Sequence, residues 1–217
     1  MSRFREVRDQ SRYFNEESSI AYYHLIAKVI EHTPGNYVYA FDDGHKKKLE
    51  DLLWELDNLY LMEVVSYCIM SNHVHIVLAR DNSAHERIKL TDVALKYQYY
   101  YKLKFAPDAR SSEVKKFRKR LNSISSFMKD FQFKFTWWFN YNQAVKRRGS
   151  LWNRRFKSVV LKSPKALAEC MKYVELNPLR AKMTKNPGST ANIERSRFTK
   201  LTQVEMDPSC SKDTIMI

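Results

Sequence analysis

Two apolar segments separated by a two-residue turn constrain the fold of this chain more than any other feature. Residues 62–70 (MEVVSYCIM) and 73–80 (HVHIVLAR) are rich in β-branched and apolar side chains, and Ser71-Asn72 between them favours a tight turn. Strands joined by so short a connection have to lie side by side and run in opposite directions. The sequence therefore predicts an antiparallel hairpin within a larger sheet.

The rest of the chain predicts both strands and helices. Residues 20–30 (IAYYHLIAKVI) and 156–161 read as strands, and a turn or loop is expected over 33–43. Beyond Lys46, leucines recur at spacings of three and four, which predicts a helix with one buried face; helices are also expected over 91–103 and 113–139. A last helix should begin with Ser163 as N-cap and Pro164 in its first turn, and end near Asn177 because Pro178 follows.

The longest predicted helix carries an apolar stripe at helical spacing. This spacing favours burial in a core over a platform for stacked bases. The stripe consists of Leu121, Ile124, Phe127, Met128, Phe131, Phe135 and Trp138.

The charge balance indicates a polyanionic partner. The 217 residues contain 38 Lys and Arg against 24 Asp and Glu, a formal charge of +14. Nucleic acid is the partner that such a field favours, while solubility alone or binding to anionic lipid are the alternatives. Three cysteines without repeated spacing fit a reducing cytoplasm, and no apolar run is long enough to predict a membrane span.

One segment concentrates that charge. Residues 146–162 (KRRGSLWNRRFKSVVLK) hold seven basic residues and no acidic one, with Trp152 and Phe156 among them. This mixture is typical of a groove that follows a nucleic-acid backbone and stacks bases on rings, and a solvated loop is the alternative. The basic run at 113–120 (EVKKFRKR) is expected to be a solvated helix face, and contact with DNA is the alternative.

Two histidines lie at alternate positions of the second hairpin strand. His73 and His75 project to the same face, so both imidazoles can reach one ion, whereas Val74, Ile76 and Leu78 project to the opposite face and can enter a core. The alternative is a pair of partly exposed strand histidines. A structural zinc site using Cys68 is not expected, because no second cysteine is nearby.

The last predicted helix carries Tyr173 and, four residues later, Asn177. Positions i and i+4 share a helix face, so the phenol and the amide can address one site. A tyrosine that only packs against the domain is the alternative.

Three segments together resemble one protein family. Residues 67–75 (YCIMSNHVH), 149–157 (GSLWNRRFK) and 173–181 (YVELNPLRA) are similar to motifs of the REP-associated tyrosine transposases, in the single-tyrosine branch of the HUH endonucleases. The resemblance covers about residues 22–181 and leaves out a basic helical insert at about 102–120. Ser71 departs from it, since relatives often carry proline there.

The resemblance implies a fold, a site and a substrate. It implies an α+β, ferredoxin-like antiparallel sheet with helices on one side, in a domain over residues 1–185, followed by a polar tail at 186–217. Mg²⁺ or Mn²⁺ would be held by His73, His75 and Asn177, while Tyr173 attacks DNA to give a 5′-phosphotyrosine and a free 3′-OH. The implied substrate is single-stranded DNA with a hairpin, such as REP elements.

The same resemblance implies how the DNA is held. Phosphates would contact Arg147, Arg148, Arg154, Arg155 and Lys157, and Trp152 would stack on a base. The expected protein is a monomer or homodimer without membrane contact, in the cytoplasm at the nucleoid. Two alternatives stay open: a non-catalytic nucleic-acid-binding domain of ferredoxin-like fold, and a metal-dependent nuclease that uses water while Tyr173 only packs.

Overall fold

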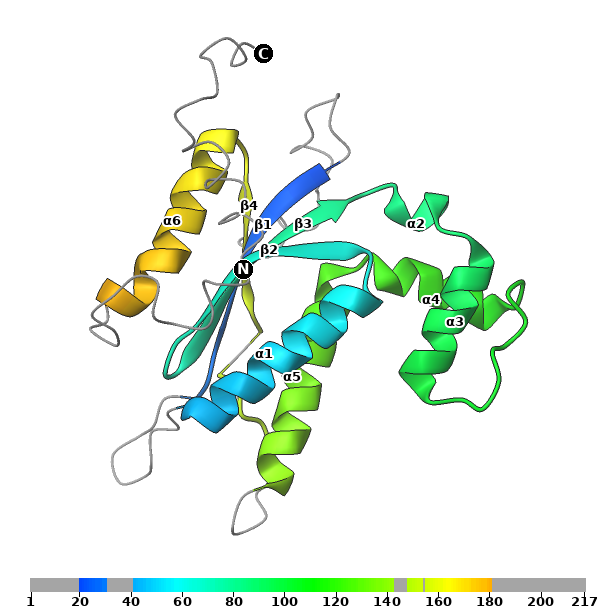
Figure 1. Ribbon diagram of the computed structural model, residues 1–217, viewed down its shortest axis with the longest axis horizontal. Helices are drawn as coiled ribbons and strands as arrows, with labels where there is room; N and C mark the ends of the chain where they lie inside the picture. Colours follow the sequence, from blue (N-terminus) through cyan, green and yellow to red (C-terminus); the bar gives the residue numbers. More distant parts are fainter. Residues whose placement is uncertain (1–19, 31–40, 143–147, 154, 181–217) are drawn as a thin grey trace, which may run out of the picture.

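A four-stranded antiparallel sheet forms the centre of the protein, in the strand order β2-β3-β1-β4 (Figure 1). The computed structural model describes residues 20–30, 41–142, 148–153 and 155–180. The strands are β1 (Ile20–Lys28), β2 (Met62–Ile69), β3 (His73–Asp81) and β4 (Lys157–Leu161). The predicted hairpin is confirmed: β2 pairs antiparallel with β3, and the Met70 amide donates to the His73 carbonyl at 2.8 Å across the turn.

Two long helices cover one face of this sheet. In α1 (Asp43–Leu59) the Asp42 side chain accepts a hydrogen bond from the His45 amide, which caps the helix start, and the leucines expected to be buried are buried. In α5 (Ile124–Tyr141) Phe127, Phe131 and Phe135 are fully buried. Side chains of both helices form one core with the facing side chains of the sheet, so the prediction that the aromatic stripe is core is confirmed.

The last helix, α6 (Pro164–Arg180), lies on the opposite face of the sheet. Its Met171 and Val174 pack in a second, smaller apolar cluster with Cys68 and Val77. The Ser163 hydroxyl accepts from the Ala166 amide at 3.1 Å, as expected of an N-cap. The prediction that the helix ends near Asn177 is wrong, because α6 continues to Arg180 with Pro178 in its last turn. A proline has a helical φ, and its missing N–H costs the helix one hydrogen bond.

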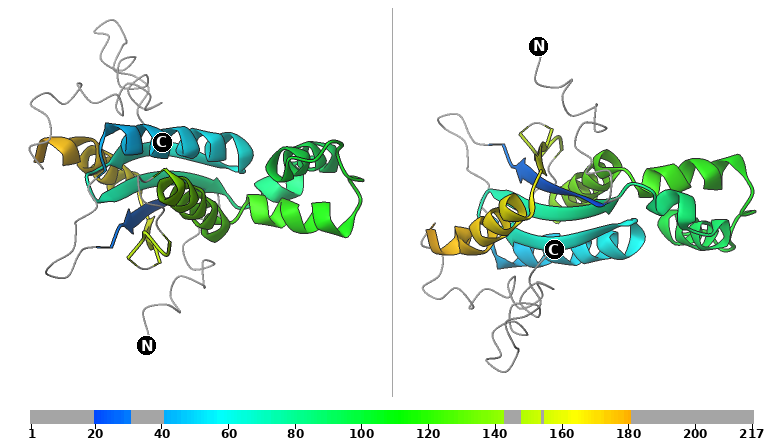
Figure 2. Two further views of the ribbon diagram at one scale, coloured as in Figure 1. Left: turned by 90° about the horizontal axis from the view of Figure 1, so that it is seen from below. Right: turned by 90° about the horizontal axis from the view of Figure 1, so that it is seen from above.

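Three short helices project from one end of the molecule, at the far end from α6 (Figure 2). They are α2 (Ala84–Arg87), α3 (Leu90–Tyr101) and α4 (Ser112–Leu121). The sequence predicts one helix over 113–139, and the structure has two, α4 and α5. The break lies at Asn122-Ser123. The Ser123 hydroxyl caps α5, and the side-chain amide of Asn122 donates to the backbone carbonyl of Asp81 at 2.9 Å.

The predicted α+β class with an antiparallel sheet is confirmed. The expected one-sided layer of helices describes α1 and α5, and α6 adds a helix to the other face. No helix of the described residues combines the length and the apolar character needed to cross a membrane. The tail predicted at 186–217 and the loop at 33–40 lie outside the described residues.

Candidate active site

Three histidines meet on the face of the sheet that α6 covers. In β3, Val74, Ile76 and Leu78 enter the main core, as predicted, so His73 and His75 project to the other face. In β1, Tyr23 and Leu25 enter the same core, which sends His24 to the face of the two β3 histidines. The antiparallel register pairs His75 with Ile26 and His24 with Val77, so His24 is a diagonal neighbour of His75.

The three imidazoles contact one another closely. His24 Nε2 lies 2.9 Å from His75 Nδ1, with the two rings stacked at a centroid distance of 5.1 Å. The His73 and His75 rings are edge to face at 4.8 Å, and His73 Nδ1 lies 2.7 Å from Asn72 Oδ1. His75 is the innermost of the three, with 3% of its surface exposed.

Tyr173 of α6 lies over this group. Its ring is edge to face with His75 at a centroid distance of 5.6 Å and with His24 at 6.3 Å. The flanking residues Met171 and Val174 are buried against the sheet, and this contact fixes α6 so that Tyr173 stands at the rim with 39% of its surface exposed. The phenol is therefore next to the histidines and also accessible from solvent.

Burial keeps the inner imidazoles neutral. Desolvation, with smaller contributions from His73 and His24, lowers the pKa of His75 to about 3, and desolvation also lowers the pKa of His24. Since His75 Nδ1 is paired with His24, the remaining nitrogen of His75 is Nε2, which is buried and has no hydrogen-bond partner. If His75 Nδ1 carries the proton and donates it to His24, Nε2 presents a lone pair, as a metal ligand must.

An amide oxygen could add a further ligand to the histidines of a metal site. No group of three or more His, Cys, Asp or Glu side chains suited to a metal ion occurs among the described residues. Asn177 lies one turn after Tyr173 in α6, and its Nδ2 is buried without a hydrogen-bond partner. Since the two ends of an amide exchange by a half-turn, its oxygen can take that position. Two unpartnered polar atoms, on His75 and Asn177, thus support the expected ligand set.

Cys68 is the cysteine beside this group, and its chemistry does not suit a metal. It pairs with His75 in the β2–β3 register and therefore shares its face, but burial raises the pKa of its thiol to about 12. Its sulfur contacts Met70 Sδ at 3.4 Å. A protonated, buried thiol is a packing group rather than a ligand.

The expected phosphate contacts divide into three groups. Arg147 and Arg154 lie outside the described residues, and Arg148 and Arg155 are exposed. Lys157 is also exposed and begins β4, where it pairs with Ile26, which in turn pairs with His75. Directly paired residues share a face, so Lys157 lies in one row with His75 across three strands, at about 10 Å between Cα atoms.

The expected base-stacking role of Trp152 is wrong. Its ring is buried, with 7% of its surface exposed, and packs against Phe41, Phe131 and Phe135. Its indole N–H donates to the Gln132 carbonyl at 3.0 Å. A tryptophan in a basic segment can join the core because its ring is apolar and its single donor needs only one acceptor.

His24 is the site residue that sequence reasoning missed. A single histidine in a strand carries no local signal, and its partner His75 is 51 residues away. Side-chain alternation does predict the face of His24, since its neighbours Tyr23 and Leu25 are apolar and would face the core. Placing His24 beside His75, however, requires the register between β1 and β3.

Comparisons with known proteins give similarity at the level of solved structures. No protein-family model and no curated protein matches the chain. A REP-associated tyrosine transposase bound to a REP hairpin is similar with a TM-score of 0.49 and 10% identity, over 79% of this chain and 74% of that one. A putative transposase from Deinococcus radiodurans R1 is similar with a TM-score of 0.39 and 16% identity, over 75% of this chain and 94% of that one. At these values neither similarity assigns a function, which depends on the site itself.

Proposed function

We propose that this protein cleaves and rejoins single-stranded DNA with hairpin structure, using Tyr173 as the nucleophile and a divalent ion, Mg²⁺ or Mn²⁺, held by His73, His75 and Asn177. The observation that carries the proposal is the position of the Tyr173 ring, 5.6 Å from that of His75 and partly open to solvent. A phenol that only packed would have no need of a neutral, buried imidazole with an unpartnered nitrogen beside it.

The covalent step exchanges one phosphate ester for another. The Tyr173 oxygen attacks phosphorus and loses its proton, the bond between phosphorus and the 3′ oxygen breaks, and that oxygen takes up a proton to become a 3′-OH. The products are a 5′-phosphotyrosine and a free 3′-OH. Attack by a 3′-OH on the phosphotyrosine reverses the same exchange and rejoins DNA.

The side chains around Tyr173 have separate tasks in this step. When bound, the divalent ion supplies Lewis-acid stabilisation of the charge on the phosphate oxygens. The core beneath β3 holds His73 and His75 at fixed positions, and the His24 contact fixes the orientation of the His75 ring. Lys157, in the row of His75, provides a cation for the DNA backbone on the same face.

A covalent adduct tests the proposal. Wild type and Tyr173→Phe are incubated with labelled hairpin DNA and Mn²⁺, denatured, and the modified peptide is mapped by mass spectrometry. We expect an adduct on Tyr173 in the wild type and none in Tyr173→Phe, whose fold is retained because only one partly exposed oxygen is removed. Tyr22, which shares the sheet face of His24 at the next alternate position, gives the matched control Tyr22→Phe, which should form the adduct normally.

The same experiment separates the alternatives. Cleavage without an adduct, undiminished in Tyr173→Phe, would identify a nuclease that uses water. Binding without cleavage under all metal conditions would identify a non-catalytic binding domain. Omission of the metal and the His73→Ala variant should each abolish cleavage while leaving DNA binding largely intact, because phosphate contacts dominate affinity.

A further inference from the structure

The exposed face of α5 carries three large aromatic side chains in a line. Phe133, Trp137 and Tyr141 are 68%, 64% and 62% exposed, and they follow one another at intervals of four residues. That spacing places them above one another, about 6 Å apart along the helix axis. Aromatic rings gathered on an exposed face indicate an interaction surface.

Two of the three rings share one orientation. Trp137 and Tyr141 are parallel to within 9°, with centroids 5.6 Å apart. Two rings with a common orientation form a platform on which planar groups can stack face to face, and nucleic-acid bases are planar groups of this kind.

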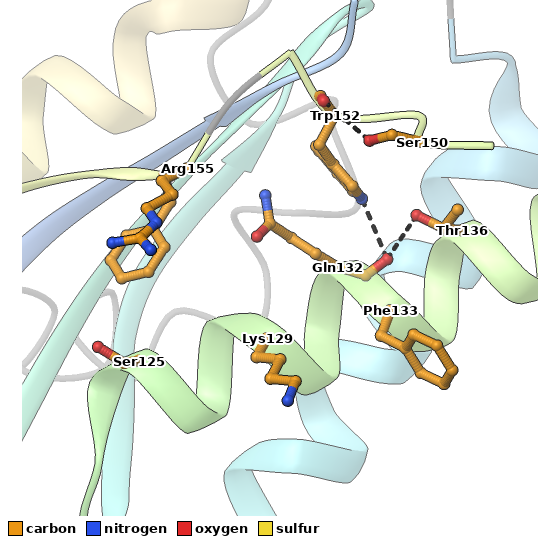
Figure 3. Close-up of a pocket in the computed structure, with 9 residues that line it drawn as sticks. Ser125, Lys129, Gln132, Phe133, Thr136, Ser150, Trp152 and Arg155 are labelled. Carbon is orange, nitrogen blue, oxygen red and sulfur yellow. Dashed lines mark hydrogen bonds between the residues drawn. The ribbon is translucent and has the colours of Figure 1, made fainter.

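A pocket of about 710 Å³ adjoins the start of this aromatic line (Figure 3). It lies between α5 and the segment that leads into β4, and Phe133 belongs to both the line and the pocket wall. Lys129 and Arg155 bring positive charge to it, and none of the described residues lining it is acidic. The pocket is therefore suited to an anion attached to a planar group.

Gln132 gives the pocket an unpartnered polar group. Its backbone carbonyl accepts from Trp152 Nε1 at 3.0 Å and from Thr136 Oγ1 at 2.7 Å, which fixes the residue. Its side-chain amide points into the space between Arg155 and Trp152 in Figure 3, and Nε2 is buried with no hydrogen-bond partner. An amide both donates and accepts, so it can pair with the edge of a base.

We propose that this surface, Gln132 with Phe133, Trp137 and Tyr141, binds an unpaired stretch of nucleic acid that leads to Tyr173. This inference rests on the proposed function and names the part of the substrate that the α5 face holds. Bases stack on the three rings, one base edge meets Gln132, and phosphates lie near Lys129 and Arg155. The strand then continues round the β4 edge of the sheet, where Lys157 stands two residues after Arg155 on the face of His75.

Charge favours this occupant over a second copy of the chain. The chain carries a formal charge of +14, and both charged residues described in the pocket wall are cations. A second copy of the chain would bring the same positive field to the contact, whereas a nucleic acid offsets it. An unpaired strand is favoured over a duplex because stacking needs exposed base faces.

Affinity for unpaired DNA tests the proposal. Dissociation constants of the full chain for a labelled oligothymidylate and for a duplex of equal length are measured by fluorescence anisotropy. Trp137→Ala should weaken binding of the single strand by about 5- to 140-fold, the value of one base stacked on one ring, and bind the duplex nearly as the wild type does. Trp137→Phe keeps a ring and should restore most of the affinity. Phe105→Ala, which removes another exposed ring, in the segment between α3 and α4, should have no effect.

Three results would overturn the inference, and a fourth would overturn only the proposed function. Unchanged affinity in Trp137→Ala, or an equal loss in Phe105→Ala, would mean that the α5 rings do not stack bases. A wild type that is dimeric by light scattering, with a monomeric Trp137→Ala that still binds the oligonucleotide, would identify the face as an interface between copies. Normal adduct formation with unchanged binding in Trp137→Ala would reject this surface and keep the proposed function. Weakened binding by Trp137→Ala, with no adduct in the wild type, would keep this surface and reject the proposed function.

Discussion

His24 and His75 form the contact on which the chemistry of the site depends. His24 Nε2 faces His75 Nδ1 at 2.9 Å, so a proton shared there leaves His75 Nε2 as the available nitrogen. Partners that hold a ligating imidazole in one tautomer typically contribute about 10- to 100-fold in metal affinity. We therefore infer that His24 orients and polarises His75 at the proposed metal site.

Replacing His24 tests that role without touching the proposed ligands. His24→Leu should weaken Mn²⁺ binding by about 10- to 100-fold, measured by isothermal titration calorimetry. His24→Gln supplies an amide oxygen as acceptor and should retain more of the affinity. Equal Mn²⁺ affinity in His24→Leu and wild type would contradict an orienting role, and circular dichroism checks that both variants fold.

The low pKa of His75 makes stability depend on pH. The folded protein keeps His75 neutral down to pH about 3, while in the unfolded chain it takes up a proton near pH 6.5. Because the unfolded state binds more protons between these values, the stabilisation is complete above pH 6.5 and is lost as pH falls. Without metal, the free energy of unfolding should therefore fall by up to about 1.4 kcal/mol per pH unit from this group. In urea titrations, the free energy of unfolding should differ less between pH 7 and pH 5.5 in His75→Gln than in the wild type. Equal differences in the two proteins would contradict a lowered pKa of His75.

At single positions, sequence reasoning succeeded where side-chain alternation decides the outcome. Val74, Ile76 and Leu78 enter the core as alternation predicts, which gives the facing of His73 and His75. It failed at Trp152, because a basic neighbourhood does not determine whether one ring turns to the core or to solvent. It also missed Phe133, Trp137 and Tyr141, which occupy the opposite side of a helix whose buried stripe was recognised.

Among the elements, a buried carboxylate joins the projecting helices to the rest of the fold. Asp130 of α5 is 5% exposed, accepts from Tyr60 at 2.6 Å and from Tyr100 at 3.1 Å, and pairs with Arg120 of α4 at 2.5 Å. Burial, together with the same carboxylate, raises the pKa of Tyr60 above its usual range and that of Tyr100 to about 12, so both phenols remain donors. Four elements or their ends thus meet at one side chain.

Removing this carboxylate should destabilise the fold. Asp130→Ala removes the carboxylate that accepts from two phenols and pairs with Arg120, which keeps only the Tyr100 hydroxyl as acceptor. The expected loss is about 3 kcal/mol in the free energy of unfolding, because the partly exposed Arg120 can regain contact with solvent. Asp92→Ala, at an exposed acid of α3, should change it by less than about 0.5 kcal/mol. Urea unfolding measures both variants, and a similar small change in the two would show that the network contributes nothing.

Element boundaries were predictable where strong local signals exist. The Ser71-Asn72 turn and the Ser163-Pro164 helix start each have a chemical signature that the structure confirms. The division between α4 and α5 was not predicted, because the apolar stripe continues through Asn122-Ser123 and hides the break. At this break the side-chain amide of Asn122 contacts the backbone carbonyl of Asp81, which is distant in sequence.

For the whole molecule, positive charge should make DNA binding depend on salt. Log affinity falls as log salt rises, and removing one cation that binds a phosphate of a single strand should make that negative slope about 0.7 less steep. We expect this change in both Arg155→Ala and Lys157→Ala, measured by anisotropy across a potassium chloride series. Arg110→Ala, at an exposed cation between α3 and α4, is the matched control and should keep the wild-type slope. Unchanged slopes in Arg155→Ala and Lys157→Ala would show that these residues are solvated surface charges that do not bind phosphate.

The attachment of α6 to a finished sheet also orders events during synthesis. All four strands and the α5 surface precede Leu161 in the chain or end with it, whereas Tyr173 comes after them, on a helix that adds a second layer. Since chains emerge from the ribosome from the N-terminus and fold as they do so, the helix with the proposed nucleophile is the last of these elements to join the fold. On the proposed function, cutting ability is therefore acquired only after the surface proposed to hold the DNA exists, and a chain whose translation stops at β4 would have no nucleophile with which to break a strand.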